Sequence, residues 1–218
     1  METNSIKVVI RIRPLQKHEK SKGEQVVAKS VSNGKEVQLK SGPNKAQIFQ
    51  CHRCFSRDTT QAELFQQCGI IELLEASLRG ARSCAFAFGQ TGAGKTHTVV
   101  GSAATVDVEE HLTHSGNGML GRAFAYIFKA ISSGRRIDGK DASTFSVRVS
   151  CLEIYHEQVY DLLADKGERQ PLNLREHQQV STWHSLSSLL SPHASHFALH
   201  FHTDICLVWF NHGNYQSQ

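Results

Sequence analysis

The segment Gly89 to Thr96, GQTGAGKT, combines glycines, a lysine and a threonine at a spacing that suits the binding of phosphate groups. In this Gly-x-x-x-x-Gly-Lys-Thr pattern the glycines let backbone N–H groups approach an anion closely. Lys95 can reach the β- and γ-phosphates of a nucleotide, and the Thr96 hydroxyl can coordinate Mg²⁺. The pattern therefore predicts a site for a nucleotide and Mg²⁺, formed by Gly89, Gln90, Thr91, Gly92, Ala93, Gly94, Lys95 and Thr96.

A loop of this kind connects a strand to a helix, and the flanking sequence fits both. The run SCAFAF at 83–88 is short and apolar, which predicts a strand buried on both faces. A helix is predicted over 95–100, and its N-terminus would direct partial positive charge toward the phosphates. This context favours a phosphate site over a chance match in a glycine-containing turn.

The rest of the chain up to residue 176 alternates between strand and helix patterns. Ile6 to Arg13 is rich in β-branched residues and stops at Pro14, which predicts a strand. Further strands are predicted at 37–40, 46–51 and 144–155, the last followed by a hairpin or short helix at 156–165.

Two longer helices are predicted between these strands. Thr60 and Glu63 form a possible capping box at the start of a helix that ends at Gly80. A second helix, over 119–131, has its apolar residues at helical spacing and so predicts a core face made of Leu120, Phe124, Ile127, Phe128 and Ile131. Alternating strands and helices indicate an α/β fold.

Residues 1–176 resemble the N-terminal half of a kinesin motor domain. The resemblance is carried by GQTGAGKTHT at the loop, VVIRIRP near the N-terminus and VSCLEIYHEQVYDLL further on. It implies a P-loop NTPase fold of the kinesin type, in which helices flank a mixed central sheet. It also implies ATP and Mg²⁺ as ligands, microtubules as partner, and a cytoplasmic, cytoskeletal location.

The resemblance adds four residues to the predicted site. It implies that Arg11, Arg13, Pro14 and His97 surround the adenine, and a guanidinium, a pyrrolidine ring and an imidazole can all stack on a flat base. Without the resemblance, Arg11 and Arg13 could equally be solvent-facing charges of a strand, and His97 an ordinary residue of a helix surface.

The chain departs from the family pattern at several places. Gly121 stands where many members have proline, and neither the Asn-x-x-Ser-Ser-Arg-Ser-His pattern of switch I nor the Asp-Leu-Ala-Gly-Ser-Glu pattern of switch II is found. These patterns sense the γ-phosphate and position water. We therefore expect ATP binding with weak or absent hydrolysis and no productive stepping. Two alternatives stay open, a non-motor nucleotide-binding or dominant-negative isoform and a non-functional truncated product.

The charge pattern changes near residue 177. All 24 Lys and Arg residues lie at or before Arg175, and Asp204 carries the only formal charge after Glu176. Seven of the 13 histidines lie in this last segment. We expect a partial, truncated motor domain at 5–176, followed at 177–218 by an unrelated, poorly ordered tail that supplies no strands to pair with 83–88.

The composition excludes several classes of protein. A net charge of +4 is too small to indicate nucleic-acid binding. No stretch approaches the roughly 18 apolar residues of a spanning helix, and the start lacks a signal-peptide pattern, so we expect a soluble intracellular protein without membrane contact. The CxxC at Cys51 and Cys54 lacks the second pair that a zinc site needs. A metal cluster could be formed by His193, His196, His200, His202 and Cys206, but the biased composition of the tail explains these residues more simply.

Overall fold

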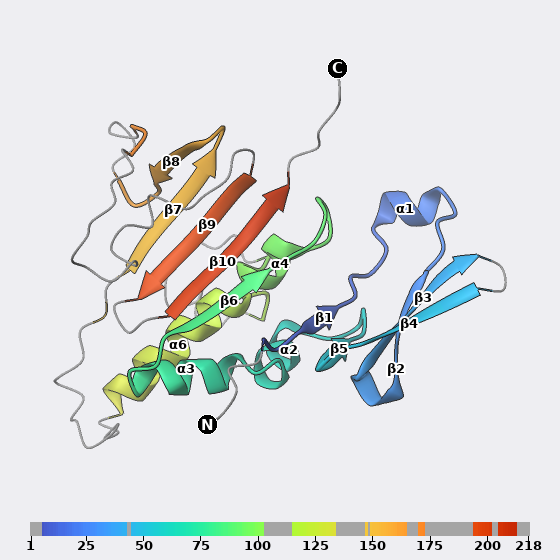
Figure 1. Cartoon of the computed structure of the whole chain (residues 1–218), viewed down its shortest axis with the longest axis horizontal. Coiled ribbons are helices and arrows are strands. Elements are labelled where there is room, and N and C mark those ends of the chain that lie inside the picture. The colour runs from blue at the N-terminus through green and yellow to red at the C-terminus, as the bar shows by residue number, and fades with distance from the viewer. Residues whose placement is uncertain are drawn as a thin grey trace. The chain divides into compact units, whose positions relative to one another are not determined.

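The computed structural model of the chain describes residues 6–42, 45–102, 115–133, 147, 149–164, 170–172, 194–201 and 205–212. The chain divides into two compact units, Met1–Gly69 and Ile70–Gln218. Figure 1 shows strands and helices in both. The described elements mix strands and helices, so the predicted α/β class is confirmed.

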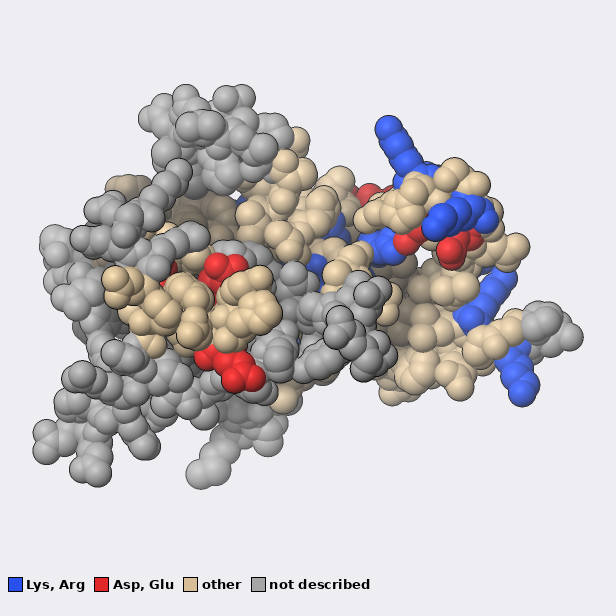
Figure 2. All heavy atoms as spheres, turned by 90° about the horizontal axis from the view of Figure 1, so that it is seen from above, with Lys and Arg blue, Asp and Glu red and all other residues tan. Residues whose placement is uncertain are grey.

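The first unit contains an antiparallel three-stranded sheet in the order β2-β3-β4. Its strands are β2 (Ala28–Val31), β3 (Glu36–Gly42) and β4 (Lys45–Gln50), and the last two confirm the strands predicted at 37–40 and 46–51. The connection between β2 and β3 is the 3₁₀ turn η1 (Ser32–Gly34), whose three residues all have positive φ. Lysine and arginine side chains project from this unit, on the right of Figure 2.

The N-terminal strand is shorter than predicted. β1 covers Val9–Arg11, not the whole of 6–13, and pairs in parallel with β5 (Arg53–Phe55). Helix α1 (Lys17–Ser21) follows. The buried core of this unit consists of Val37, Cys54, Phe55, Leu64, Phe65 and Cys68.

The predicted capping box is confirmed at the start of α2 (Gln61–Gln67). The N–H of Glu63 donates to the Thr60 hydroxyl oxygen at 3.2 Å, and the N–H of Thr60 donates to the Glu63 carboxylate at 2.8 Å. The single helix predicted from this point to Gly80 is wrong, because α2 ends at Gln67 and α3 (Ile70–Leu78) begins separately. Gly69 lies between them at φ +90°, in the left-handed region that interrupts an α-helix.

The second unit is built on a five-stranded mixed sheet in the order β6-β10-β9-β7-β8. β6 and β10 run parallel, and the other neighbours run antiparallel. Helix α3 packs against β6 and α6, and the short helix α4 lies against β6 and β10 (Figure 1). The bounds are β6 (Ser83–Ala87), α4 (Lys95–Val99), α6 (Met119–Ser132), β7 (Val149–Tyr155), β8 (Gln158–Asp161), β9 (Ala194–Phe201) and β10 (Ile205–His212).

Strand β6 forms where SCAFAF predicts it, but it is not buried on both faces. Cys84 and Phe86 are exposed, and 58% of Phe86 is accessible, whereas Ser83 is buried. Helices α3 and α4 pack against β6, and the Ser83 hydroxyl donates to the Leu73 carbonyl of α3. Because side chains alternate along a strand, Cys84 and Phe86 lie on the opposite face.

The expectation that residues after 176 supply no partner strand for 83–88 is wrong. β10 pairs with β6 from Ile205 opposite Ser83 to Trp209 opposite Ala87. β9 in turn joins β10 to β7, so the last segment completes the sheet. The rest of the predicted tail, 177–193, 202–204 and 213–218, lies outside the described residues.

Helix α6 and the β7–β8 hairpin follow their sequence patterns. Of the predicted apolar face of α6, Ile127 is fully buried together with Ala123, while 49% of Phe128 is exposed. The hairpin turns at His156 and Glu157, which both have positive φ, as a tight two-residue turn requires. Among the described residues, no helix has the length and apolar character needed to cross a membrane.

Candidate nucleotide-binding site

The loop between β6 and α4 takes a backbone path that depends on its glycines. Gly89, Gly92 and Gly94 have φ values of +153°, +79° and +94°. A side chain at any of them would be strained, and a Cβ at Gly89 would also lie 3.0 Å from the Cβ of Ala93. The glycines that suggest a phosphate loop in the sequence are therefore the residues that let the chain fold back on itself here.

Lys95 is folded into this loop. Only 6% of the residue is exposed, and its Nζ donates to the backbone carbonyls of Gly89 at 2.6 Å and Gln90 at 2.9 Å. The N–H of Ala93 donates to the same Gln90 carbonyl at 3.0 Å. Burial lowers the pKa of the Lys95 ammonium. Among the described residues, the hydrogen-bond partners of this enclosed cation are neutral carbonyl groups.

The residues next to Lys95 are open to solvent. Thr96 and His97 lie in the first turn of α4, and both are exposed, as are Gln90 and Thr91. The Thr96 carbonyl accepts the N–H of Val100 at 2.8 Å, so the helix fixes its backbone. The Thr96 hydroxyl is therefore accessible to a ligand beside a buried ammonium.

Arg11 is a partly buried residue of the first unit. Its Nη1 donates to Oε1 of Gln61 at 2.8 Å, and its Nη2 donates to the Thr59 carbonyl at 3.3 Å. Burial lowers the pKa of this guanidinium. These contacts tie β1 to the start of α2, so Arg11 is not the solvent-facing charge that its place in a strand also allowed.

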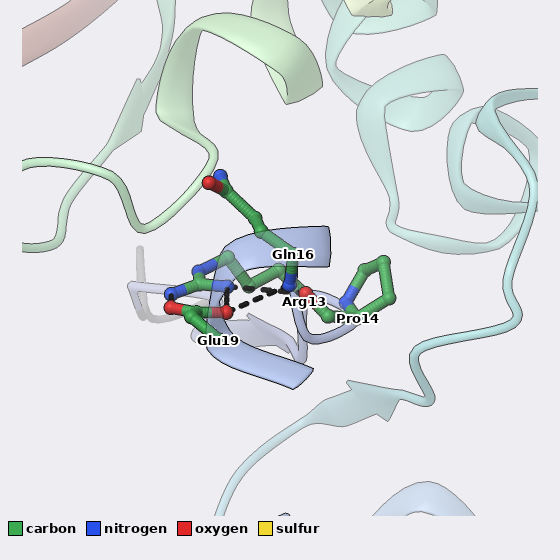
Figure 3. A network of polar contacts seen from close by, with 4 residues as sticks. All are labelled: Arg13, Pro14, Gln16 and Glu19. Atoms are coloured by element: carbon green, nitrogen blue, oxygen red, sulfur yellow. Dashed lines mark hydrogen bonds and ion pairs between the residues drawn. The ribbon is translucent and has the colours of Figure 1, made fainter. Parts of the chain in front are cut away.

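Arg13 forms an ion pair with Glu19 (Figure 3). Nη1 of Arg13 donates to Oε2 of Glu19 at 2.7 Å and to the Pro14 carbonyl at 3.1 Å, and Nη2 donates to the other carboxylate oxygen. The N–H of Gln16 also donates to Glu19, at 2.7 Å. The Arg13 hydrogen bonds hold the pKa of Glu19 down at about 2, and the pKa of Arg13 is raised in return.

The structure brings together one part of the predicted site. Gly89 to His97 form one continuous loop and helix start in the second unit, whereas Arg11, Arg13 and Pro14 belong to the first unit. Their meeting around an adenine stays a prediction. Glu19, Gln61 and Thr59, which hold the two arginines, were not predicted from the sequence. Glu19 accepts the N–H of Gln16, as the glutamate of a capping box does, but glutamine is not one of the usual N-cap residues, so the sequence carries no clear signal for it.

A comparison with protein families decides the class of the chain. The model of the kinesin motor domain matches residues 11–198. The chain belongs to the kinesin motor domain family. The match extends past residue 176, the position at which the resemblance is expected to end.

Individual kinesin-like proteins agree with this assignment. The chain is 32% identical over 182 residues to kinesin-like protein KIF27 of Homo sapiens, a match that covers 84% of the chain and 12% of that protein. It is 34% identical over 177 residues to kinesin-like protein KIF15 of Homo sapiens, a match that covers 81% of the chain and 12% of that protein. It is also 34% identical over 175 residues to kinesin-like protein KIN-12E of Arabidopsis thaliana, a match that covers 79% of the chain and 13% of that protein. This kinesin chain therefore spans about an eighth of the length of these relatives.

Proposed function

We propose that this kinesin chain binds ATP and Mg²⁺ through the loop from Gly89 to Thr96. The observation that carries the proposal is the enclosed ammonium of Lys95, which donates to the Gly89 and Gln90 carbonyls. A phosphate oxygen is a stronger partner for an ammonium than a neutral carbonyl oxygen, because its negative charge adds a Coulombic attraction to the hydrogen bond. An arriving triphosphate would therefore draw the Lys95 ammonium toward itself.

The neighbouring residues have complementary parts in this proposal. Mg²⁺, when bound with ATP, would neutralise charge on the phosphates, and the exposed hydroxyl of Thr96 is the group that would hold it. Gly92 and Gly94 allow the backbone to approach the phosphates without side chains in the way. The loop would thus supply one charge, one metal ligand and a close backbone surface.

We propose further that Arg11, Arg13, Pro14 and His97 form the adenine end of the site. The Arg13–Glu19 ion pair uses the edge of the guanidinium, whereas stacking on a base uses its face. The Arg11 guanidinium donates to Gln61 and to the Thr59 carbonyl. Arg11 would therefore hold β1 in place, and it would contact the base only through the exposed part of its side chain.

For the chain as a whole we propose a microtubule motor domain of the kinesin type, at the cytoskeleton, with microtubules as its partner. The family assignment supports this proposal. Because neither switch pattern occurs in the 218 residues, we propose that a polypeptide of this sequence turns ATP over slowly or not at all. The alternatives, a non-motor nucleotide-binding or dominant-negative isoform and a non-functional product, differ from it in measurable ways.

Equilibrium binding of a fluorescent ATP analogue to the whole chain tests the proposal. Lys95→Ala should weaken binding by at least a hundredfold, since it removes the only buried ammonium of the loop, whereas Lys129→Ala on the exposed side of α6 should leave it unchanged. Chelation of Mg²⁺ should weaken binding to the wild type more than to Thr96→Ala. Equal affinities of the wild type and Lys95→Ala would contradict the proposal.

A microtubule-stimulated ATPase assay separates the remaining possibilities. ATP binding with negligible stimulated turnover is the expected result. Strong stimulation by microtubules would contradict slow turnover, and the absence of both ATP binding and a cooperative thermal transition would favour the non-functional product.

A further inference from the structure

The outer edge of β4 has no partner strand in the part of the chain that the structure describes. All six residues of β4 are exposed, and among the described residues β4 pairs only with β3. The opposite edge of this sheet, formed by β2, is covered by β5. The Ser30 hydroxyl of β2 donates to the Cys54 carbonyl of β5 at 3.0 Å. The backbone groups along one side of β4 are therefore placed to pair with an added strand.

Exposed apolar side chains accompany this edge on both faces. Ile48 and Phe49 are 57% and 47% exposed, and Leu39 on β3 is 36% exposed. Phe49 lies opposite Val37 and Gln47 lies opposite Leu39, so Phe49 and Leu39 share one face while Ile48 lies on the other. An added strand would find apolar contacts for side chains on either of its faces.

The edge also lacks the usual protection against strand addition. Edge strands of soluble proteins commonly carry central charges or proline, or are covered. The sequence of β4, KAQIFQ, has neither proline nor a central charge, and its single charge is Lys45 at its first position. The edge of β4 is thus suited to pairing with another strand, because it lacks the charges and proline that protect other edge strands.

The charges around the edge of β4 favour an added strand that carries negative charge. Between residues 28 and 50 there are four lysines, Lys29, Lys35, Lys40 and Lys45, and one acidic residue, Glu36. The carboxylate of Glu36 already accepts the Ser32 hydroxyl. The whole first unit is basic, with 12 Lys and Arg against 6 Asp and Glu, whereas the second unit has 12 against 14. Figure 2 shows these basic side chains projecting from the unit.

We infer that the outer edge of β4 is a docking site for an extended acidic peptide segment of a partner protein, which adds a fourth strand to the sheet. Main-chain hydrogen bonds to β4 supply affinity, and the alternating side chains of the segment supply selectivity. Acidic side chains approach Lys40 and Lys45, and apolar ones contact Ile48 or Phe49. The site does not depend on nucleotide binding.

A second copy of the chain fits this edge less well. Pairing two β4 strands would bring Lys45 of each copy beside a basic sheet with no acidic residue in β4 to offset it. Like charges placed opposite each other across strands are destabilising. Charge complementarity therefore favours an acidic segment over self-association.

The test uses the whole chain and a fluorescein-labelled synthetic peptide of three Val-Glu repeats, followed by fluorescence anisotropy. Two control peptides carry three Val-Lys repeats and a block of three glutamates followed by three valines. The chain variant combines Lys40→Glu and Lys45→Glu, and a matched control variant combines Lys17→Glu and Lys20→Glu on the exposed side of α1. All four lysines are exposed, and circular dichroism verifies that the variants fold.

The proposal predicts that the Val-Glu repeat binds at least tenfold more tightly than either control peptide. The Lys40/Lys45 variant should lose at least tenfold in affinity, and the Lys17/Lys20 variant less than threefold. Amide hydrogen exchange should slow at alternate residues of β4 when the peptide is bound. Equal binding of the block peptide, unchanged exchange in β4, no binding at all, or concentration-dependent self-association that the peptide does not compete would each overturn it.

Discussion

Arg13 and Glu19 show how the segment between β1 and α1 is held by a single charged pair. The carboxylate accepts from both ends of the guanidinium and from the N–H of Gln16 at the start of α1 (Figure 3). Because these bonds are made to the ionised carboxylate, they lower the pKa of Glu19. The pair therefore fixes the position of Arg13, one of the residues proposed to face the base.

This pKa shift predicts a defined dependence of stability on pH. The pKa of Glu19 falls from 4.5 in the unfolded chain to about 2 in the folded chain. Its contribution is fully present above pH 4.5 and is lost as the pH falls through about 2. The difference in free energy of unfolding between the wild type and Glu19→Gln should therefore shrink steadily over that range.

Urea unfolding at several pH values from 6 to 2 measures this difference. Glu24→Gln, which removes an exposed carboxylate of the same unit, is the control for the loss of one negative charge. A Glu19→Gln difference that stays constant across the range would contradict the assignment.

At the scale of elements, α6 contains a glycine in its first turn. Gly121 is the third residue of α6. Glycine inside a helix costs about 1 kcal/mol relative to alanine. A Cβ at this position would first meet the Cγ of Asn117 at 3.4 Å, which is ordinary contact.

We predict that Gly121→Ala raises the free energy of unfolding by about 0.5 to 1 kcal/mol, because it removes that cost without a clash. Gly118→Ala, three residues earlier, is the matched comparison. Its Cβ would lie 2.5 Å from the Val99 carbonyl oxygen and 2.7 Å from the backbone nitrogen of Gly101, so it should destabilise the fold. Urea denaturation of both variants measures whether their free energies of unfolding change in opposite directions. Equal changes in the two variants would contradict the packing described for α6.

The sequence of the strand at 194–201 has a two-residue period. In 194–201, ASHFALHF, the residues Phe197, Leu199 and Phe201 alternate with smaller or polar residues, which is the period of a strand. The low charge and abundant histidines of the segment suggested a disordered tail. The alternation was the better guide, since residues 194–201 form β9.

At the scale of the whole molecule, the second unit depends on strands that are far apart in the sequence. β10 pairs with β6 across more than a hundred residues, and β9 connects β10 to β7. Loop closure over such distances is costly, so the sheet forms only if these pairings compensate for it. The phosphate loop follows directly after β6 and so relies on the last segment for its support.

We predict that a chain ending at residue 193 loses the cooperative unfolding of the second unit and aggregates. Removing β9 and β10 leaves β6 with its exposed Phe86 and unpaired edges among the described strands. A chain ending at residue 212 retains both strands and should behave as the full chain does. Thermal denaturation and sedimentation velocity measure the difference, and a soluble 1–193 chain with Lys95-dependent ATP binding would contradict it.

The sequence alone determined the features that are governed by near neighbours. The glycines and Lys95 of the loop, the Thr60 capping box, the α6 pattern and the family all follow from residues a few positions apart, because local hydrogen bonds and φ preferences act at that range. Only the tertiary structure decided which strand lies beside β6, and that β6 is an edge strand. A two-residue period marks a strand but not its neighbour, because strand partners are chosen by packing between distant residues.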